Sequence, residues 1–372
     1  MNFEDCTMKK IVLMPAIAGG MVLAGALASV TAAPPADRAS PLRVGLMAVA
    51  DPAGGFQGQV EVSITNTSRH TARVPKWQLP SNLVESKLFQ ISRDGVAVAY
   101  QGPMIKRGLP QAEDFAILRA GETLRSVVDL SKAYDFSQSG EYVVALNSVL
   151  QFASLSDGTM LRQGNGLPQI AKSAPLSLWV AGKGQGASTQ GKPSGGGSSV
   201  VGGVSYKSCS ATQIDSIGSA VTAARGYAEN AKGYLNAGTV GPRYTTWFGA
   251  YTSARYSTAS QHFVAIDAAL DQSNGEVTVN CGCNQKYYAY VYPNQPYEIY
   301  VCRAFWTAPL TGTDSKAGTL IHETSHFTAV AGTDDHVYGQ SGAKNLAITD
   351  PASAVDNADS HEYFAENTPS QN

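Results

Sequence analysis

Charged residues are scarce in this chain, and neither sign is in clear excess. Asp, Glu, Lys and Arg make up 15% of the 372 residues, against roughly a quarter in an ordinary soluble domain. With 27 basic and 29 acidic residues, the formal net charge is −2. The chain therefore has no surplus of basic side chains to neutralise a phosphate backbone, and we expect no nucleic-acid partner.

Long apolar runs are also rare, and the one that exists lies at the start of the chain. Two lysines precede an apolar run from Ile11 to about Ala28, and small residues follow it. This order predicts a secretory signal peptide over residues 1–33, cleaved after Ala32 or Ala33. A retained membrane anchor is the alternative, because the run approaches spanning length, but the proline and glycines within it disfavour an anchor. We expect a secreted protein with no membrane attachment after cleavage.

Cysteines are few. Of the 5 in the chain, Cys6 would be lost with the signal peptide. The remaining four are Cys209, Cys281, Cys283 and Cys302. An even set in one region of an exported chain predicts two disulfides.

Residues 34–180 show no helical period and have the alternation of short strands. A hairpin is expected where residues 88–92 and 96–100 flank Arg93-Asp94-Gly95. Further strands are predicted at residues 59–64, 115–118, 124–130 and 142–146. About seven strands in this length favour a β-sandwich, which we expect to be an immunoglobulin-like domain.

Gly and Ser dominate residues 181–203, which predicts a flexible, protease-accessible linker. Beyond it, the period changes to that of helices. We expect helices over residues 214–235 and about 243–271, a short β region to residue 302, and three closing helices. Residues 34–200 carry 16 basic and 12 acidic groups, a balance of +4, whereas residues 201–372 carry 9 and 15, a balance of −6. The two halves are expected to attract each other, unless the asymmetry is incidental.

The most specific chemistry lies between Gly318 and His326. His322 and His326 are four residues apart, so on a helix both imidazoles can reach one ion while Glu323 projects toward a metal-bound water. Zn²⁺ suits this arrangement because imidazole nitrogens bind it well and it does no redox chemistry. Asp314 is expected to cap the helix.

A catalytic zinc has a third protein ligand and one open position. Ala329 and Gly332 stand where a metzincin would have Gly and His, which excludes that class. The thermolysin class is disfavoured because no Glu occurs between Glu323 and Glu362. Gly332 can adopt the positive φ that turns the chain back after the helix. The third ligand is then expected to be Asp334, Asp335 or His336.

Further strings carry a family resemblance. They are Gly332-Thr333-Asp334-Asp335-His336-Val337-Tyr338-Gly339, Arg243 to Gly249, Ala304 to Pro309, and Asn357 to Phe364. With the helical motif, they resemble the aspzincin (deuterolysin) family of metalloendopeptidases, in particular its peptidyl-Lys branch, from about Val204 to Asn372. The resemblance implies a mainly α, zincin-like (α+β) catalytic domain over residues 204–372. It would bind one Zn²⁺ ion and act on proteins or peptides.

The resemblance also implies roles for single residues. Asp335 would be the third zinc ligand, and Glu323 the general base. Tyr338 would donate to the developing oxyanion, an interaction commonly worth a few kcal/mol. Asp359 would bind the ammonium of a lysine that follows the scissile bond, or else would orient His361 or cap the last helix.

Other candidates are given structural roles. Asp334 is expected to be a turn residue, and His336 and His361 to be structural or on the surface. The disulfide pairs implied by the resemblance are Cys209 with Cys281 and Cys283 with Cys302.

Residues 34–180 lie outside the resemblance, and we interpret them as a prodomain that inhibits the catalytic domain within the same chain. Lys183 and Lys192 lie in the linker, so a lysine-directed protease could mature by cutting itself there. The alternative is a secreted adhesin or binding protein, in which the sandwich is the working part and a closed, four-ligand metal site is structural.

Overall fold

The computed structural model describes residues 40–49, 56, 58–182 and 199–371. These described residues belong to one compact unit. The predicted signal peptide and most of the predicted linker, with Lys183 and Lys192, lie outside the described residues. Within the described part of the chain, no helix is both long and apolar enough to cross a membrane.

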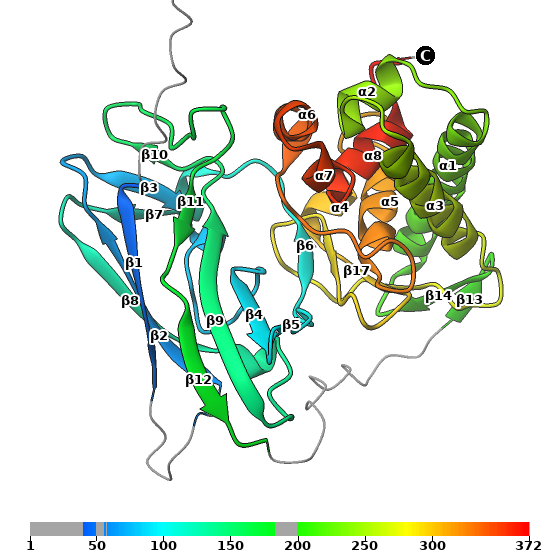
Figure 1. Cartoon of the computed structure of the whole chain (residues 1–372). Coiled ribbons are helices and arrows are strands. Elements are labelled where there is room, and N and C mark those ends of the chain that lie inside the picture. The colour runs from blue at the N-terminus through cyan, green and yellow to red at the C-terminus, as the bar shows by residue number, and fades with distance from the viewer. Residues whose placement is uncertain (1–39, 50–55, 57, 183–198, 372) are drawn as a thin grey trace, which may run out of the picture. The chain divides into compact units, whose positions relative to one another are not determined.

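The region before residue 180 is rich in β-strands, as expected (Figure 1). Its strands are β1 (Leu42–Ala48), β2 (Gln59–Asn66), β3 (Ala72–Pro75), β4 (Phe89–Arg93), β5 (Val96–Ala97), β6 (Met104–Lys106), β7 (Phe115–Leu118), β8 (Thr123–Asp129), β9 (Gly140–Val149), β10 (Ser154–Leu155), β11 (Ile170–Lys172) and β12 (Leu176–Val180). Three of its sheets have the orders β1-β2-β8, β10-β3-β7 and β11-β9-β4-β5, and β12 also pairs with β9.

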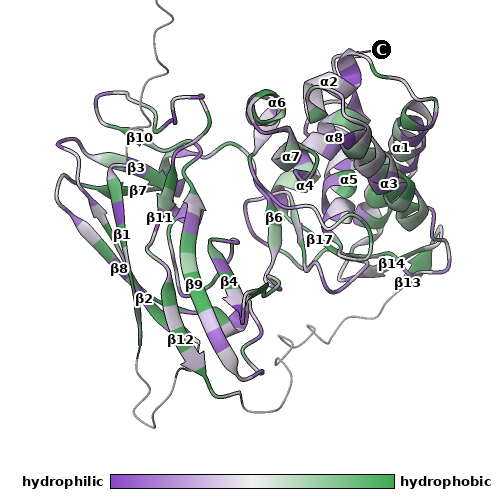
Figure 2. Cartoon of the chain, in the orientation of Figure 1, coloured by the Kyte–Doolittle hydropathy of each residue, from purple (hydrophilic) through white to green (hydrophobic). Residues whose placement is uncertain are grey.

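The predicted hairpin is confirmed. Arg93 pairs with Val96 across Asp94 and Gly95, and both loop residues have positive φ, 50° and 82°. This is the geometry that a two-residue hairpin loop needs. Strand β9 alternates buried and more exposed residues, and Figure 2 shows hydrophobic and hydrophilic colours along it. One face of β9 therefore contributes to the core, with Tyr142 and Val144 fully buried.

The region after residue 199 combines helices with a small sheet. Its elements are β13 (Ser199–Val201), β14 (Val204–Lys207), α1 (Ala211–Asn236), α2 (Pro242–Phe248), α3 (Ser253–Leu270), β15 (Thr278–Asn280), β16 (Ala289–Val291), β17 (Glu298–Val301), α4 (Arg303–Thr307), α5 (Lys316–His326), α6 (Gly339–Thr349), α7 (Pro351–Ala354) and α8 (Ala358–Glu366). Helices α1, α3 and α5 pack against one another (Figure 1).

Two helix predictions are wrong. The helix expected over residues 243–271 is two helices, because Gly249 has a φ of 78° and ends α2. Five helices, not three, follow β17 in the described part of the chain. Several of these are only one or two turns long, too short for a helical period to show in the sequence.

Strand β6 joins the sheet of the C-terminal region, although it comes from the N-terminal region. The sheet has the order β13-β14-β15-β17-β16-β6, and β6 runs antiparallel to β16. A pairing between residues near 105 and residues near 290 was not expected.

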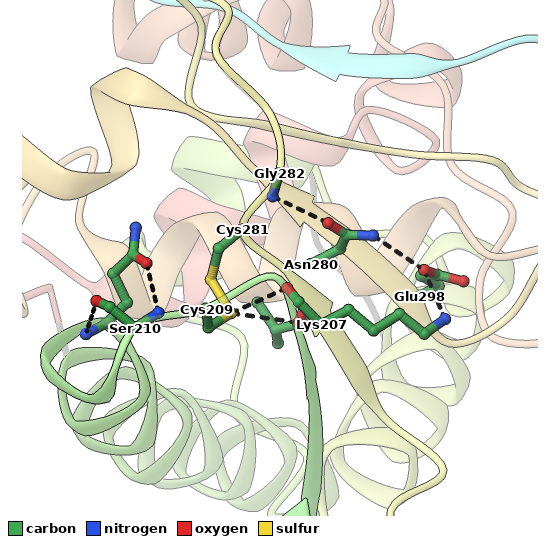
Figure 3. The surroundings of a disulfide bond; sticks show 9 residues. Lys207, Cys209, Ser210, Asn280, Cys281, Gly282 and Glu298 are labelled. Carbon is green, nitrogen blue, oxygen red and sulfur yellow. Dashed lines mark hydrogen bonds and ion pairs between the residues drawn. A yellow bond between two sulfur atoms is a disulfide. The ribbon is translucent and has the colours of Figure 1, made fainter. Parts of the chain in front are cut away.

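Both disulfides implied by the resemblance are present. Cys209 pairs with Cys281 across 72 residues of sequence, and Cys283 pairs with Cys302 across 19. Figure 3 shows the first pair beside the start of α1, where the capping side chain of Ser210 lies. A loop of this length gives a stabilisation of roughly 4 kcal/mol in the chain-entropy model.

Candidate metal centre and acidic pocket

Helix α5 carries two of the candidate metal ligands, His322 and His326, and is almost entirely buried. Ser315 caps it, since its hydroxyl accepts a hydrogen bond from the backbone N–H of Gly318 at 2.9 Å. The prediction that Asp314 caps the helix is wrong, because Asp314 has a φ of 52° and precedes the cap. The cap fixes where the helix begins and so fixes the direction in which His322 and His326 project.

Three side chains converge on one point beside α5. The Nε2 atoms of His322 and His326 are 3.1 Å apart. Oδ1 of Asp335 lies 3.3 Å from Nε2 of His322 and 3.4 Å from Nε2 of His326. Burial disfavours the charge on Asp335, but the two imidazoles hold the pKa of its carboxyl well below the usual range. An anionic oxygen and two imidazole nitrogens thus face a common centre.

The turn after α5 explains why Asp335, and not Asp334, is in this group. Gly332 has a φ of 63°, as expected, and reverses the chain. The carbonyl of Thr333 lies 2.7 Å from Nδ1 of His326. Asp334 instead pairs with Lys87 Nζ at 2.5 Å.

These residues fit a tetrahedral zinc ion. With bonds of 2.0–2.1 Å, tetrahedral ligand atoms are about 3.3 Å apart, which matches the three distances above. The far nitrogen of His326, Nδ1, donates to the carbonyl oxygen of Thr333, as is usual for a zinc-binding imidazole. The far nitrogen of His322, Nδ1, lies 2.9 Å from Oδ1 of Asp359, an ion-pair contact.

Glu323 follows the first ligand and is fully buried. Neither of its carboxylate oxygens has a hydrogen-bond partner among the described residues. Burial raises the pKa of Glu323 to about 7, and the imidazoles of His322 and His326 act against that rise. A carboxyl group with a pKa near neutrality can both accept and return a proton.

Tyr338 bridges the metal group and the N-terminal region. Its hydroxyl lies 3.1 Å from Oδ2 of Asp335 and also 3.1 Å from the backbone carbonyl oxygen of Ile105 in β6. Burial and the charge of Asp335 raise the pKa of Tyr338. The hydroxyl therefore keeps its proton and can donate a hydrogen bond to a carbonyl oxygen.

An acidic pocket lies next to the metal group and contains Lys106 of β6. The Nζ atom of Lys106 is 2.6 Å from Oε2 of Glu362, 3.6 Å from Oδ1 of Asp314 and 3.9 Å from Oδ1 of Asp359. Lys106 is only 1% exposed. Burial disfavours its charge, but Glu362, Asp359 and Asp314 outweigh burial and raise its pKa.

Comparison with known proteins agrees with this geometry. Residues 234–366 match the aspzincin family, described as lysine-specific metallo-endopeptidases. An extracellular protease of Aeromonas hydrophila is 43% identical over 84% of this chain and 89% of its own length. A peptidyl-Lys metalloendopeptidase of Grifola frondosa is 35% identical over 84% and 89%. One of Pleurotus ostreatus is 51% identical over 44% of this chain and 97% of its own length.

The chain belongs to the aspzincin family. It is a metalloendopeptidase, which confirms the enzyme expectation over the adhesin alternative. The first two relatives also match the β-rich region of this aspzincin. The Pleurotus ostreatus relative, in contrast, matches less than half of the whole chain.

The remaining histidines of this aspzincin lie outside the metal group. Nε2 of His336 is 2.8 Å from Oδ2 of Asp356. Nε2 of His361 is 2.9 Å from Nδ1 of His262, and the ring of His361 stacks on Phe263. The structural or surface roles expected for His336 and His361 stay predictions.

Sequence reasoning missed two members of the acidic pocket, Glu362 and Asp314. A signal for Glu362 existed, because Asp359 and Glu362 are three residues apart and share one face of a helix. Lys106 had no signal of its own, since its partners are more than 200 residues away in the sequence.

Proposed function

We propose that the chain is the secreted precursor of a zinc-dependent endopeptidase that cuts peptide bonds on the N-terminal side of lysine. The observation that carries the proposal is the convergence of His322, His326 and Asp335 beside Glu323, whose buried carboxylate has no partner among the described residues. Three protein ligands leave the fourth position of a zinc ion open, as catalysis requires. One ion fits this group.

The residues divide the chemistry as follows. The ion would be held by His322, His326 and Asp335, and it supplies Lewis acidity that makes water a nucleophile at neutral pH. Glu323 accepts the proton of the attacking water and returns it to the nitrogen of the leaving amine. The hydroxyl of Tyr338 donates to the carbonyl oxygen as negative charge develops on it.

Preference for lysine is supported by the acidic pocket. Asp359 and Glu362 are nearly inaccessible to solvent, and a buried pair of carboxylates strongly favours a cation as its ligand. A lysine side chain already fits this space, because Lys106 fills it in the structure. The pocket would therefore receive the residue that follows the scissile bond.

Inhibition by the chain's own prodomain is supported by the same contact. Strand β6 comes from the predicted propeptide domain, residues 34–180, and occupies the edge of β16 beside the metal group. An external substrate needs the pocket that Lys106 fills. This proposal also includes the expected immunoglobulin-like sandwich, the zincin-like catalytic domain from residue 204, and the linker, in which Lys183 and Lys192 are targets for self-cleavage. The N-terminal sequence and the name of the Aeromonas hydrophila relative, an extracellular protease, support secretion.

Cleavage-site mapping tests the proposal. The full chain, matured in the presence of zinc, is added to a mixed protein digest, and the new N-termini are identified by mass spectrometry. We expect most new N-termini to begin with Lys, and we expect a chelator or Glu323→Gln to lower the rate by at least about 10³-fold. Cleavage without preference for Lys would refute the specificity. An unchanged rate with Glu323→Gln would refute the mechanism.

A further inference from the structure

Strand β6 is held at the metal centre in an extended conformation. Met104, Ile105 and Lys106 pair with Val291, Tyr290 and Ala289 of β16, in that order. The backbone N–H of Tyr288 also donates to the carbonyl oxygen of Lys106 at 3.1 Å. All three residues of β6 are buried. Addition of an extended segment to a sheet edge is a common way for proteins to bind peptides.

One peptide bond of this strand, between Ile105 and Lys106, is held from both sides. The carbonyl oxygen of Ile105 accepts a hydrogen bond from the hydroxyl of Tyr338, which also contacts Asp335. On the other side of the bond, the ammonium of Lys106 lies in the acidic pocket, 2.6 Å from Glu362.

The chain after Lys106 continues along a cleft. Arg107, Gly108 and Leu109 line a cavity of about 750 Å³ together with Tyr287, Tyr288 and Tyr338. The guanidinium of Arg107 lies 5.4 Å from the centre of the Tyr287 ring, within reach of a cation–π interaction. Residues on both sides of the Ile105–Lys106 bond therefore have places on the C-terminal region.

An anchoring role alone does not account for these contacts. Burying an ammonium among carboxylates is costly, and apolar residues of similar size would often anchor a strand as well or better. An anchor would also not need the Ile105 carbonyl to contact Tyr338. A substrate needs both contacts.

We infer that β6 is bound in the manner of a substrate and that Ile105–Lys106 is a self-processing site of this chain. The inference rests on the proposed function. It also assigns β16 as the strand that pairs with external substrates, with the residue before the cut opposite Tyr290 and the lysine after the cut opposite Ala289.

The step is an ordinary hydrolysis. The oxygen of water bonds to the carbonyl carbon of Ile105, and the C–N bond to Lys106 breaks. Glu323 moves the proton of the water to the nitrogen of Lys106. The second proton of the water is released as the new carboxyl group ionises and is taken up by the new amine, so the products are a carboxylate at Ile105 and an α-ammonium group at Lys106, with no other reactant.

The first test follows the full chain alone. Wild type is incubated with zinc at several protein concentrations, and new N-termini are sequenced over time. We expect a new terminus at Lys106, and we expect its first-order rate constant to be the same at every protein concentration. Glu323→Gln and Lys106→Ala should not form it, whereas Lys172→Ala, which alters an exposed prodomain lysine, should. A wild-type chain that cuts external lysine peptides but keeps the Ile105–Lys106 bond intact overturns the inference alone. A chain that cuts no peptide overturns the proposed function and the inference with it.

The second test measures binding without catalysis. A fluorescent peptide with the sequence of residues 102–109 is titrated into full-length Glu323→Gln, with and without Lys106→Ala. We expect at least tenfold tighter binding when Lys106 is substituted, because the anchor of β6 is lost and its site becomes available. Lys106→Gln, which keeps most of the side-chain length, replaces Lys106→Ala if that variant does not fold, and Lys172→Ala is the control. Equal affinity for the chains with and without the Lys106 substitution would overturn the inference.

Discussion

Asp359 contacts groups that belong to two different tasks. Its Oδ1 lies 2.9 Å from Nδ1 of His322 and 3.9 Å from Nζ of Lys106, and its Oδ2 accepts from the backbone N–H of Gly339 at 2.5 Å. A carboxylate on the far nitrogen of a metal-binding imidazole fixes its tautomer and increases its basicity. The same charge attracts a lysine ammonium, so we expect Asp359 to link metal binding to substrate binding.

Asp359→Asn should therefore weaken metal binding. We expect the dissociation constant for zinc to rise by about 10–100-fold, the usual effect of losing such a partner. The measurement is competition with a chromophoric chelator in the Glu323→Gln background, where no cleavage can complicate the titration. Asp356→Asn is the matched control, because Asp356 contacts His336, which lies outside the group of His322, His326 and Asp335. Equal zinc affinities for the Asp359 and Asp356 variants would contradict the expectation.

Most residues of the candidate metal group could be predicted from the sequence, and the residues that were missed have a physical reason in common. The spacing of His322 and His326 and the turn at Gly332 restrict the third ligand to three neighbouring residues, because they depend on local geometry. The choice of Asp335 needed the family resemblance, and its role stays a prediction. Glu362 and Asp314 became visible only in three dimensions, since their shared partner is Lys106.

At the scale of elements, Gly318 allows α8 to approach α5. A Cβ at Gly318 would lie 2.1 Å from Oε1 of Glu366. That carboxylate cannot move freely, because it accepts hydrogen bonds from the backbone N–H groups of Asp314 and Ser315 and from the Ser315 hydroxyl. Gly318→Ala must either break these bonds or separate the helices.

We expect Gly318→Ala to reduce the free energy of unfolding by about 1–3 kcal/mol, the usual cost of overpacking. Thermal denaturation in the Glu323→Gln background measures the change without self-digestion. Gly226→Ala in α1 is the matched control, since a Cβ there has no atom within 4 Å. In an exposed helix interior, that change should instead stabilise by roughly 0.5–1 kcal/mol. A Gly318 variant as stable as wild type would show that Glu366 can move.

Long or locally patterned elements were predictable, and short ones were not. The hairpin at Asp94–Gly95 and helices α1 and α5 follow from turn chemistry or a helical period. Strand β6 has only three residues and pairs with a strand nearly 200 residues away, and no local pattern records such a partner. The break at Gly249 was missed because the apolar period continues across it.

At the scale of the whole molecule, the oppositely charged halves are joined by a few specific ion pairs. Lys87 and Lys106 of the basic half contact Asp334 and Glu362 of the acidic half. Lys286 and Glu113 pair in the reverse sense, but both side chains are 60% exposed, and such pairs contribute little. The attraction predicted from net charge thus depends most on buried Lys106. The immunoglobulin-like topology of the N-terminal region stays a prediction.

Stability of the whole molecule should also depend on pH through His361. Its Nδ1 lies 3.0 Å from the carbonyl oxygen of Asn357, so Nδ1 carries the proton and Nε2 accepts from Nδ1 of His262. Burial, and then the neighbouring His262, lower the pKa of His361 to about 3. Burial also lowers the pKa of His262, against the opposing charge of Asp356.

A histidine whose pKa is lowered by folding contributes its full stabilisation at pH values above its unfolded pKa of about 6.5. This contribution is lost as the pH falls toward the folded pKa. The loss arises because, between the two pKa values, only the unfolded chain takes up the proton. Between pH 7 and pH 5, His361 should cost about 2 kcal/mol of unfolding free energy. Denaturant unfolding of the metal-free Glu323→Gln chain at both pH values measures this loss, and adding His361→Gln should remove most of it. Substituting the exposed His70 by Gln controls for the loss of a histidine as such. If the His361 variant loses as much stability between the two pH values as its parent, acid sensitivity must arise from other groups.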